Sequence, residues 1–265
     1  VVAKAESTAD ETDAESLEHD LILAGFIGIE DPVRPEVAPA VVKCQAAGIE
    51  VLMITGDHPA TALAVAGKAG IVEPGCTTHL TGEALKQLTV EALVEQLRQG
   101  VRVFARTTPE QKMKIVTALK HIDKVVAMTG DGVNDAPALR AADIGIAMGK
   151  MGTDVARESA QIILLDDNFA SIVDGIEEGR TVFENMKKFT SYVLVSNGPE
   201  ILPYLLYIVL PVPLALNIIH ILSIDLGTDL VPSMGLGQEP ADPEVMSKPP
   251  RQPSESLLSK LLMLR

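Results

Sequence analysis

"VVAMTGDGVNDAPAL" (residues 125–139) takes an apolar stretch directly into a glycine-rich turn that carries oxygen-bearing side chains. These side chains are Asp131, Asn134 and Asp135. Asp-Gly is a common turn signal and Asn-Asp-Ala-Pro a common helix start, so this stretch alone fits an ordinary strand–turn–helix unit. The rest of the chain decides whether the turn also carries chemistry.

Around this turn, apolar strands alternate with amphipathic helices across residues 21–165. The predicted strands are residues 21–29, 49–54, 101–106, 124–128, 144–148 and 161–165, and the predicted helices are residues 36–47, 58–69, 109–121, a short helix from 136, and 153–159. Such alternation predicts an α/β fold with a Rossmann-like parallel sheet covered on both faces. Chemistry in such sheets collects at the carboxyl ends of the strands.

Three polar clusters follow three of these strands. They contain Thr55, Gly56 and Asp57; Arg106 and Lys112; and Thr129, Gly130, Asp131, Gly132, Asn134 and Asp135. Together they offer a hydroxyl and backbone N–H groups for phosphoryl oxygens, an ammonium for their charge, and a carboxylate pair suited to Mg²⁺. Each cluster alone is explained by a turn, a cap or a surface lysine. Their coincidence at three strand ends predicts phosphoryl transfer.

Composition narrows the possible partners. A net charge of −14 over 265 residues argues against nucleic acid as a partner of the whole chain. Residues 6–20 carry seven acids and no Lys or Arg, which predicts a solvated loop, and this acidic start predicts no signal peptide. Cys44 and Cys76 lie 32 positions apart without a CxxC motif, so buried thiols are favoured over a metal site or a disulfide.

Residues 192–236 are overwhelmingly apolar, long enough for two membrane spans of about 20 residues each. The break between the spans is expected at residues 211–213, Pro-Val-Pro, as a tight turn. Basic residues flank the hairpin on both sides, which places both ends in the cytoplasm. A buried helical hairpin of a globular protein remains the alternative.

Acids inside such spans are costly and are candidates for function. Two groups of oxygen donors each share a helix face, namely Asn197 with Glu200, and Asp225 with Thr228 and Asp229. Pro199 and Pro232 lack N–H groups, so the carbonyls of Val195 and Thr228 are expected to be free for a ligand. These hard donors suit Na⁺, K⁺, Ca²⁺ or H⁺ rather than copper or zinc. Structural polar pairs are the alternative.

The motifs "MTGDGVNDAPAL", "TGD" and "ARTTPEQKMKIV" resemble the phosphorylation domain of P-type cation-transporting ATPases, which has the haloacid-dehalogenase-like fold. "GIEDPVRPEV" resembles the hinge segment of that family, and the resemblance extends from about residue 21 to residue 265. "SNGPE" and "IDLGTDLVP" resemble the fifth and sixth membrane helices of type II pumps. Asp225 stands where calcium pumps usually have Asn, which favours the sodium/potassium group.

The resemblance implies a role for each matched residue. Thr55, Gly56 and Asp57 would contact the phosphoryl group and organise dephosphorylation. Lys112 would neutralise an aspartyl phosphate. Asp131 would hold Mg²⁺, Asn134 would bond phosphate oxygens, and Asp135 would support the metal site. Four residues would bind ATP: Arg34 at the hinge, Arg106 near the nucleotide phosphates, Lys112 and Asn134. Five residues in the membrane helices would bind the transported cation: Asn197, Glu200, Asp225, Thr228 and Asp229.

The implied activity is ATP-driven transport of a hard inorganic cation through an aspartyl phosphate, with ATP and Mg²⁺ as cofactors. The family's nucleophilic Asp lies in a DKTGT segment, which this sequence does not contain. The chain is therefore expected to be an internal fragment, inactive alone, whose partners are the cation, ATP, the lipid bilayer and the rest of the pump with its nucleotide and actuator domains. The expected location is a multi-pass membrane protein of a bacterial plasma membrane, with its soluble domain cytoplasmic.

The expected domains are an acidic loop or nucleotide-domain end (residues 1–20), part of the phosphorylation domain (21–180), a stalk with two membrane helices (181–237), and a cytoplasmic loop leading to a seventh helix (238–265). A long, nearly continuous helix is predicted from about residue 170 past residue 192. Two rivals remain open. A membrane-tethered phosphatase of the same fold would need its own nucleophilic Asp, and a non-enzymatic cation-binding hairpin would have no use for Lys112, Asp131 and Asn134.

Overall fold

The computed structural model of the chain describes residues 2–4, 22–26, 31–211, 213–214 and 216–251, which fall into two compact units, Val1–Arg34 and Pro35–Arg265. In the first unit, β1 (Val2–Lys4) pairs antiparallel with β2 (Ile22–Gly25). Assigning residues 21–29 to the parallel sheet was therefore wrong, and residues 21 and 27–30 lie outside the described residues. An apolar run specifies a strand but not the direction of its neighbour, which explains the error.

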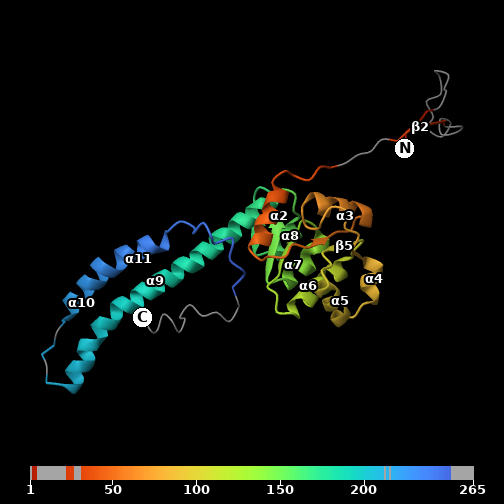
Figure 1. Cartoon of the computed structure of the whole chain (residues 1–265). Coiled ribbons are helices and arrows are strands. Elements are labelled where there is room, and N and C mark those ends of the chain that lie inside the picture. The colour runs from red at the N-terminus through yellow and green to blue at the C-terminus, as the bar shows by residue number, and fades with distance from the viewer. Residues whose placement is uncertain (1, 5–21, 27–30, 212, 215, 252–265) are drawn as a thin grey trace. The chain divides into compact units, whose positions relative to one another are not determined.

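The second unit begins with an α/β body in which helices and strands alternate (Figure 1). Its elements are α2 (Val37–Ala46), β3 (Met53–Ile54), α3 (Pro59–Lys68), β4 (Leu80–Thr81), α4 (Gly82–Gln87), α5 (Val90–Arg98), β5 (Val103–Ala105), α6 (Pro109–Lys120), β6 (Ala127–Gly130), η1 (Val133–Asp135), α7 (Ala136–Ala141), β7 (Ile144–Met148), α8 (Asp154–Ser159) and β8 (Ile162–Leu164). The predicted strands and helices of this body are confirmed, with strands mostly shorter than expected. The strand and two helices in residues 80–98 were not predicted.

The strands of this body form two parallel three-stranded sheets, in the orders β3-β5-β4 and β6-β7-β8. The predicted parallel sheet is therefore confirmed as two groups of paired strands. Within the described residues, β3 and β6 each lie at an edge, and the two do not pair with each other. The turns that carry the Thr55 and Asp131 clusters follow these two edge strands.

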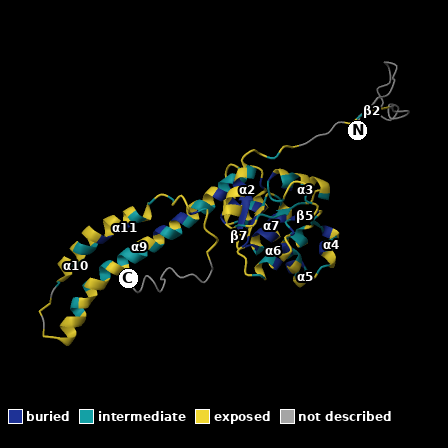
Figure 2. Ribbon diagram, viewed as in Figure 1, coloured by how far each residue is buried: buried dark blue, intermediate teal, exposed yellow. Residues whose placement is uncertain are grey.

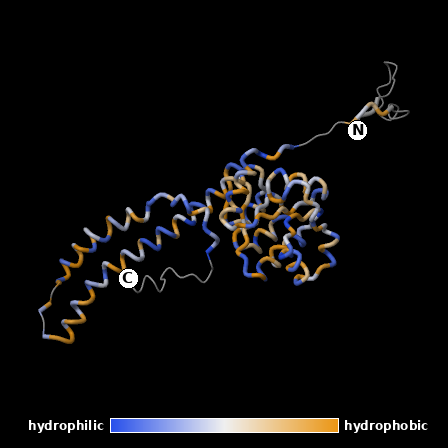
Figure 3. The backbone as a smooth tube through the Cα atoms, in the orientation of Figure 1, coloured by the Kyte–Doolittle hydropathy of each residue, from blue (hydrophilic) through white to orange (hydrophobic). Residues whose placement is uncertain are grey.

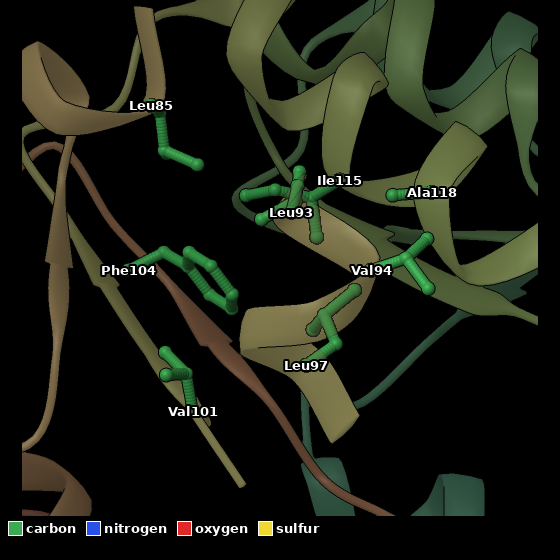
Figure 4. Packing of buried hydrophobic residues seen from close by; sticks show 8 residues of the cluster. All are labelled: Leu85, Leu93, Val94, Leu97, Val101, Phe104, Ile115 and Ala118. Carbon is green, nitrogen blue, oxygen red and sulfur yellow. The ribbon is translucent and has the colours of Figure 1, made fainter. Parts of the chain in front are cut away.

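The core of the body gathers around the fully buried Phe104 of β5 (Figure 4). Its neighbours in this cluster come from α4, α5 and α6 and include Leu85, Leu93, Leu97 and Ile115. A second cluster lies between α6, β6, α7, β7 and α8. Ile54 of β3 packs against both clusters, so the two sheets share one apolar interior. Burial of this kind contributes about 25 cal/mol per Å² of apolar surface.

Helix α9 (Phe169–Val209) runs for 41 residues without interruption, which confirms the predicted long helix. It contains Pro199 and Pro203 and ends directly before the predicted break at residues 211–213. The chain then forms α10 (Ile218–Ile224), the π-helical turn η2 (Asp225–Asp229) and α11 (Leu230–Gly237), and α11 packs beside α9 (Figure 1). In the described part of the chain, no helix has both the length and the hydropathy needed to cross a bilayer. The membrane hairpin stays a prediction.

Residues 239–251, called here the strap, follow α11 and contact α9 and the end of α2. The guanidinium of Arg180 on α9 donates to the carbonyls of Val245 at 2.9 Å and Lys248 at 2.7 Å, both in the strap. It also donates to the Ala47 carbonyl at the end of α2, at 2.9 Å. Val245 is buried. Most of the other buried residues of the second unit lie in the α/β body (Figure 2). One arginine therefore links three segments of the second unit.

Candidate functional site

The Thr55–Asp57 turn after β3 is held in shape by its own side chains and by the chain after β5. The Thr55 hydroxyl donates to Asp57 Oδ2 at 3.0 Å, and the Asp57 N–H donates back to the Thr55 hydroxyl at 3.1 Å. The N–H and the hydroxyl of Thr107 both bond the Thr55 carbonyl, at 3.1 and 3.0 Å, and the Arg106 N–H donates to the Asp57 carbonyl. The structure thus brings the first two predicted clusters together through their main chains.

Lys112 connects this region to the third cluster. It lies in the first turn of α6, which a capping box formed by Thr108 and Gln111 begins. Its ammonium forms an ion pair with Asp135 Oδ1 at 2.6 Å, and only 16% of the Lys112 side chain and 8% of the Asp135 side chain are exposed. A buried charge needs such a partner to offset its lost hydration. The pair fixes α6 against the turn after β6.

Asp135 also holds the main chain of the turn in which it lies. Its Oδ2 accepts the N–H groups of Asp131 at 3.2 Å and Gly132 at 3.1 Å. Gly130 leaves room for this arrangement, because a Cβ there would lie 2.4 Å from the Asp135 Cβ. Asp135 is therefore occupied on both carboxylate oxygens, by an ammonium and by two backbone donors.

The side chains of Asp131 and Asn134 are exposed at this turn, and the Asp131 carboxylate accepts no hydrogen bond from another described residue. Arg106 is exposed and has a φ of 53°, a left-handed conformation that is uncommon outside glycine. Gly56 is exposed as well. Arg34 belongs to the first unit. The proposed contacts of these residues with phosphate or nucleotide stay predictions.

The resemblance implies Mg²⁺ at Asp131 and Asp135, and the available donors can be compared with what the ion requires. Mg²⁺ is commonly held by one or two carboxylates together with water and substrate phosphate. Among the described residues, no group of three His, Cys, Asp or Glu side chains could enclose a metal by itself. The exposed, unengaged Asp131 carboxylate fits the first requirement. Asp135, with both oxygens engaged, supports the turn around it.

A second candidate site lies between α9 and η2. A cavity of about 440 Å³ is lined by four of the five predicted cation ligands, namely Asn197, Glu200, Asp225 and Asp229. Val193 and Ile201 complete its lining. Oε1 of Glu200 is buried and has no hydrogen-bond partner among the described residues. Buried polar atoms in proteins usually have a partner, so Oε1 of Glu200 is available to a cation or a water molecule.

Thr228, the fifth predicted ligand, is arranged differently. Its hydroxyl donates to the Ile224 carbonyl at 2.7 Å, as in many helices. Its carbonyl, expected to be free because of Pro232, accepts the Tyr192 hydroxyl. That part of the prediction is therefore wrong, because the freed carbonyl finds a donor on the facing helix. The ligand role of Thr228 itself stays a prediction.

Two polar residues of α9 at this site were missed from the sequence. Ser196 donates its hydroxyl to Asp229 Oδ1 at 2.6 Å, and Tyr192 bonds Thr228. Both positions carried a usable signal, because Tyr192, Ser196 and Glu200 are spaced four apart and so share one helix face.

Comparisons with known proteins agree with this arrangement. Residues 3–143 match the family of haloacid dehalogenase-like hydrolases, and residues 213–265 match the family described as cation transporting ATPase, C-terminus. The sodium/potassium-transporting ATPase subunit alpha-2 of Gallus gallus is 46% identical over 271 residues, and that of Bos taurus is 47% identical over 264 residues. These alignments cover 92% and 90% of this chain but 26% of each relative.

Among solved structures, a zinc-transporting PIB-type ATPase matches with a TM-score of 0.58 and 30% identity, covering 78% of this chain and 28% of that chain. This chain therefore spans about a quarter of the length of the curated relatives, at 26%. The fold, the turn motifs and the family matches lead to one assignment. The chain belongs to the haloacid dehalogenase-like hydrolases, and its C-terminal match and its curated relatives are cation-transporting ATPases.

Proposed function

We propose that this chain supplies part of the phosphorylation site and part of the cation site of an ATP-driven pump for a hard inorganic cation. The observation that carries the proposal is α9, an unbroken helix of 41 residues. Phe169 and Ala170, at its start, pack in an apolar cluster of the α/β body, and its later residues Asn197 and Glu200 line the oxygen-rich cavity. A rigid element that joins a phosphoryl-transfer site to a cation site can couple the two sites.

At the phosphorylation site, Asp131 would hold Mg²⁺, which would neutralise charge on the transferring phosphoryl group. Asp135 keeps the Asp131 main chain in place and orients the Lys112 ammonium beside it. Lys112 would then stabilise the negative charge of an aspartyl phosphate. Asn134, exposed on the same turn, would donate to a phosphate oxygen. Thr55 and Asp57 would bind the phosphoryl group from the facing turn.

The nucleophilic Asp is proposed to come from elsewhere in a longer polypeptide. In support, β3 and β6 have no strand partner on one side among the described residues, while Ile54 of β3 packs against the cluster that contains Met128 of β6. A parallel strand between β3 and β6 would join the two sheets. Its carboxyl end would emerge between the Thr55 and Asp131 turns, where a phosphoryl acceptor is needed.

For the transported ion we propose Na⁺ or K⁺. The cavity is lined by carboxylate and amide oxygens, which are hard donors, and the sequence has no cysteine in residues 192–236 to favour a soft metal. The curated relatives are named as sodium/potassium-transporting ATPases. The choice of Asp at position 225 agrees with this group.

We also propose that residues 192–236 lie in a bilayer. Many large apolar side chains of α9, α10 and α11 are exposed, and the distal part of α9 is strongly apolar (Figure 3). Examples are Ile208 and Val209 on α9 and Ile218 on α10, which are 77%, 79% and 76% exposed. Apolar surface of this extent is unfavourable in water. The proposed location is a multi-pass membrane protein with the α/β body in the cytoplasm.

The test uses the longer polypeptide that contains this chain. Cation-stimulated ATP hydrolysis and acid-stable phosphoenzyme are measured for wild type, Glu200→Gln, Asp229→Asn and Asp131→Asn. Glu200→Gln and Asp229→Asn should raise the cation concentration for half-maximal activity at least about 10-fold, because a loss of about 1.4 kcal/mol of binding corresponds to tenfold. Asp131→Asn should lose phosphoenzyme. Equal hydrolysis without cation dependence in the two cavity variants would instead favour a tethered phosphatase.

A further inference from the structure

Residues 149–153, between β7 and α8, form a loop held tightly against the sheet. A Cβ at Gly152 would lie 1.9 Å from the Met148 carbonyl oxygen, and one at Gly149 would lie 2.7 Å from the Leu164 carbonyl oxygen. Only glycine fits backbone approaches this close. The guanidinium of Arg157 on α8 also donates to the Gly149 carbonyl, at 2.8 Å. The loop therefore has little freedom to shift as long as these contacts persist.

Asp167 is the principal polar support of this loop. Its carboxylate accepts three successive backbone N–H groups, those of Gly149 at 2.7 Å, Lys150 at 3.0 Å and Met151 at 2.8 Å. Asp167 has a φ of 54°, a left-handed conformation that Asp and Asn tolerate better than most residues. Desolvation opposes ionisation here, but the three backbone bonds and the Lys150 charge lower the pKa of Asp167 overall. Successive N–H groups of this kind form a binding site for an anion.

The far end of the same loop touches the candidate magnesium ligand. The Thr153 N–H donates to the carbonyl of Asp131 at 2.8 Å. The N–H of Asp131 is held by Asp135 on the other side. Both backbone polar groups of Asp131 are therefore hydrogen-bonded, its carbonyl to Thr153 and its N–H to Asp135. These two bonds fix the main chain from which the Asp131 side chain projects.

Asp167 also stands two residues before the start of α9. The following residue, Asn168, caps α9 by accepting the Ala170 N–H at 3.0 Å. The preceding residue, Asp166, accepts the hydroxyl of Ser171 in the first turn of that helix. The segment that anchors the loop is therefore the same segment that begins the long helix.

We propose that Asp167 is a positioning residue that fixes Asp131 for metal binding through the 149–153 loop and joins this arrangement to the start of α9. The relay runs from the Asp167 carboxylate through the loop N–H groups to Thr153 and then to the Asp131 carbonyl. The role in metal binding rests on the proposed function, since it assumes that Asp131 holds Mg²⁺. The hydrogen-bonded connection from Asp167 to Asp131 can be tested without that assumption.

The structural test compares amide hydrogen exchange in this chain for wild type, Asp167→Asn and Asp166→Asn. Asparagine tolerates the left-handed backbone but lacks the charge and one acceptor oxygen. Asp167→Asn should speed exchange in residues 149–153 and 130–132, while α6 stays unchanged. Asp166→Asn is the matched control, because its carboxylate bonds Asn168 and Ser171 and not the loop. Unchanged exchange at residues 130–132 in Asp167→Asn would overturn the relay.

The functional test uses the longer polypeptide and measures the Mg²⁺ concentration for half-maximal phosphoenzyme formation. Residues that orient metal ligands typically change metal affinity 10- to 100-fold, so Asp167→Asn should raise this concentration by about 10-fold or more. Full phosphoenzyme should return at saturating Mg²⁺. An Asp167→Asn variant that needs no more Mg²⁺ than wild type would exclude the positioning role. If the wild-type protein formed no phosphoenzyme, the proposed function would be wrong. The amide hydrogen-exchange experiment would still test whether Asp167 positions Asp131.

Discussion

Three carboxylates in this protein, those of Asp135, Asp167 and Asp143, hold main-chain N–H groups. Asp135 binds Lys112 and two N–H groups, and Asp167 binds three N–H groups. Asp143 behaves similarly, since its Oδ2 accepts the Val126 N–H at 2.8 Å before β6 begins. Its Oδ1 pairs with Lys120 of α6 at 2.9 Å. Asp143 and Asp135 therefore fix the chain at the two ends of β6, and Asp167 fixes the loop after β7.

Asp143 yields a prediction about pH. The Val126 hydrogen bond first, and Lys120 second, hold the pKa of Asp143 below its ordinary value of 3.8. A lowered folded-state pKa stabilises the protein at all pH values above the unfolded pKa of about 3.9, and this stabilisation disappears as pH falls through the folded-state value. Asp143→Asn should therefore lower the free energy of unfolding at pH 7 and 5, with a smaller difference below about pH 4.

Urea unfolding at several pH values measures this difference. Asp123→Asn, which removes a nearby exposed carboxylate that does not bond Val126, is the control. A wild-type minus Asp143→Asn difference that stays constant from pH 7 to pH 3 would contradict the argument.

For single residues, the sequence predicted which side chains lie together at the candidate site but not which hydrogen bonds they form. Lys112 and Asp135 were placed at one site from strand-end logic, and they do meet. The same logic predicted Asp135 as a metal ligand; both of its oxygens accept protein donors, and its role at a metal stays a prediction. Which acceptor a lysine chooses depends on distances of a few tenths of an ångström, which spacing along the chain does not determine.

Among the elements, α9 was the most predictable, because few helix breakers occur in its first half and its apolar pattern is long. The strand and helices in residues 80–98 were missed although Thr81 and Thr89 accept the N–H groups of Ala84 and Ala92 as N-caps. The two-residue β4 is too short to show an alternating pattern. Strand pairing was the least predictable feature, since the apolar strand at residues 22–25 pairs antiparallel with β1.

Breaking α9 is the prediction at this scale. Val182→Pro removes a backbone donor and places a ring against the preceding turn, which costs about 3 kcal/mol or more in a helix interior. In the longer polypeptide, cation transport per ATP hydrolysed should fall, because the two sites no longer share a rigid element. Val182→Ala is the matched control, since Val182 is 48% exposed and alanine favours helix. Unchanged transport per ATP in Val182→Pro would show that α9 does not couple the sites.

In the second unit, the strap contacts both α9 and the end of α2, which also pack directly against each other. Arg180 bonds carbonyls of both α2 and the strap. A Cβ at Gly48, whose φ is 71°, would lie 2.7 Å from the Pro250 ring, so the strap also fits closely over the end of α2. Further along α9, Asn185 donates to the Glu239 carbonyl at 2.8 Å. The strap is thus attached at both its ends.

Releasing the strap is the prediction for the whole unit. Arg180→Met removes the hydrogen bonds to Ala47, Val245 and Lys248 while keeping an unbranched side chain. A glutamyl endopeptidase should then cleave the strap after Glu244, before Val245, several-fold faster, because local opening exposes the chain to the protease. Arg98→Met, an exposed substitution on α5, controls for the general effect of losing a positive charge. Equal cleavage rates in both variants would mean that Arg180 does not hold the strap.

The length of α9 has a geometric consequence. At 1.5 Å per residue, Glu200 lies about 45 Å along the axis from Phe169. A lever of that length converts a tilt of about 4° at its base into a displacement of about 3 Å at Glu200. Cation–oxygen distances are about 2.4 Å, so a swing this small is enough to pull an oxygen out of a coordination shell. In the proposed pump, a slight rotation beside the Thr55 and Asp131 turns would therefore be amplified into the release of an ion.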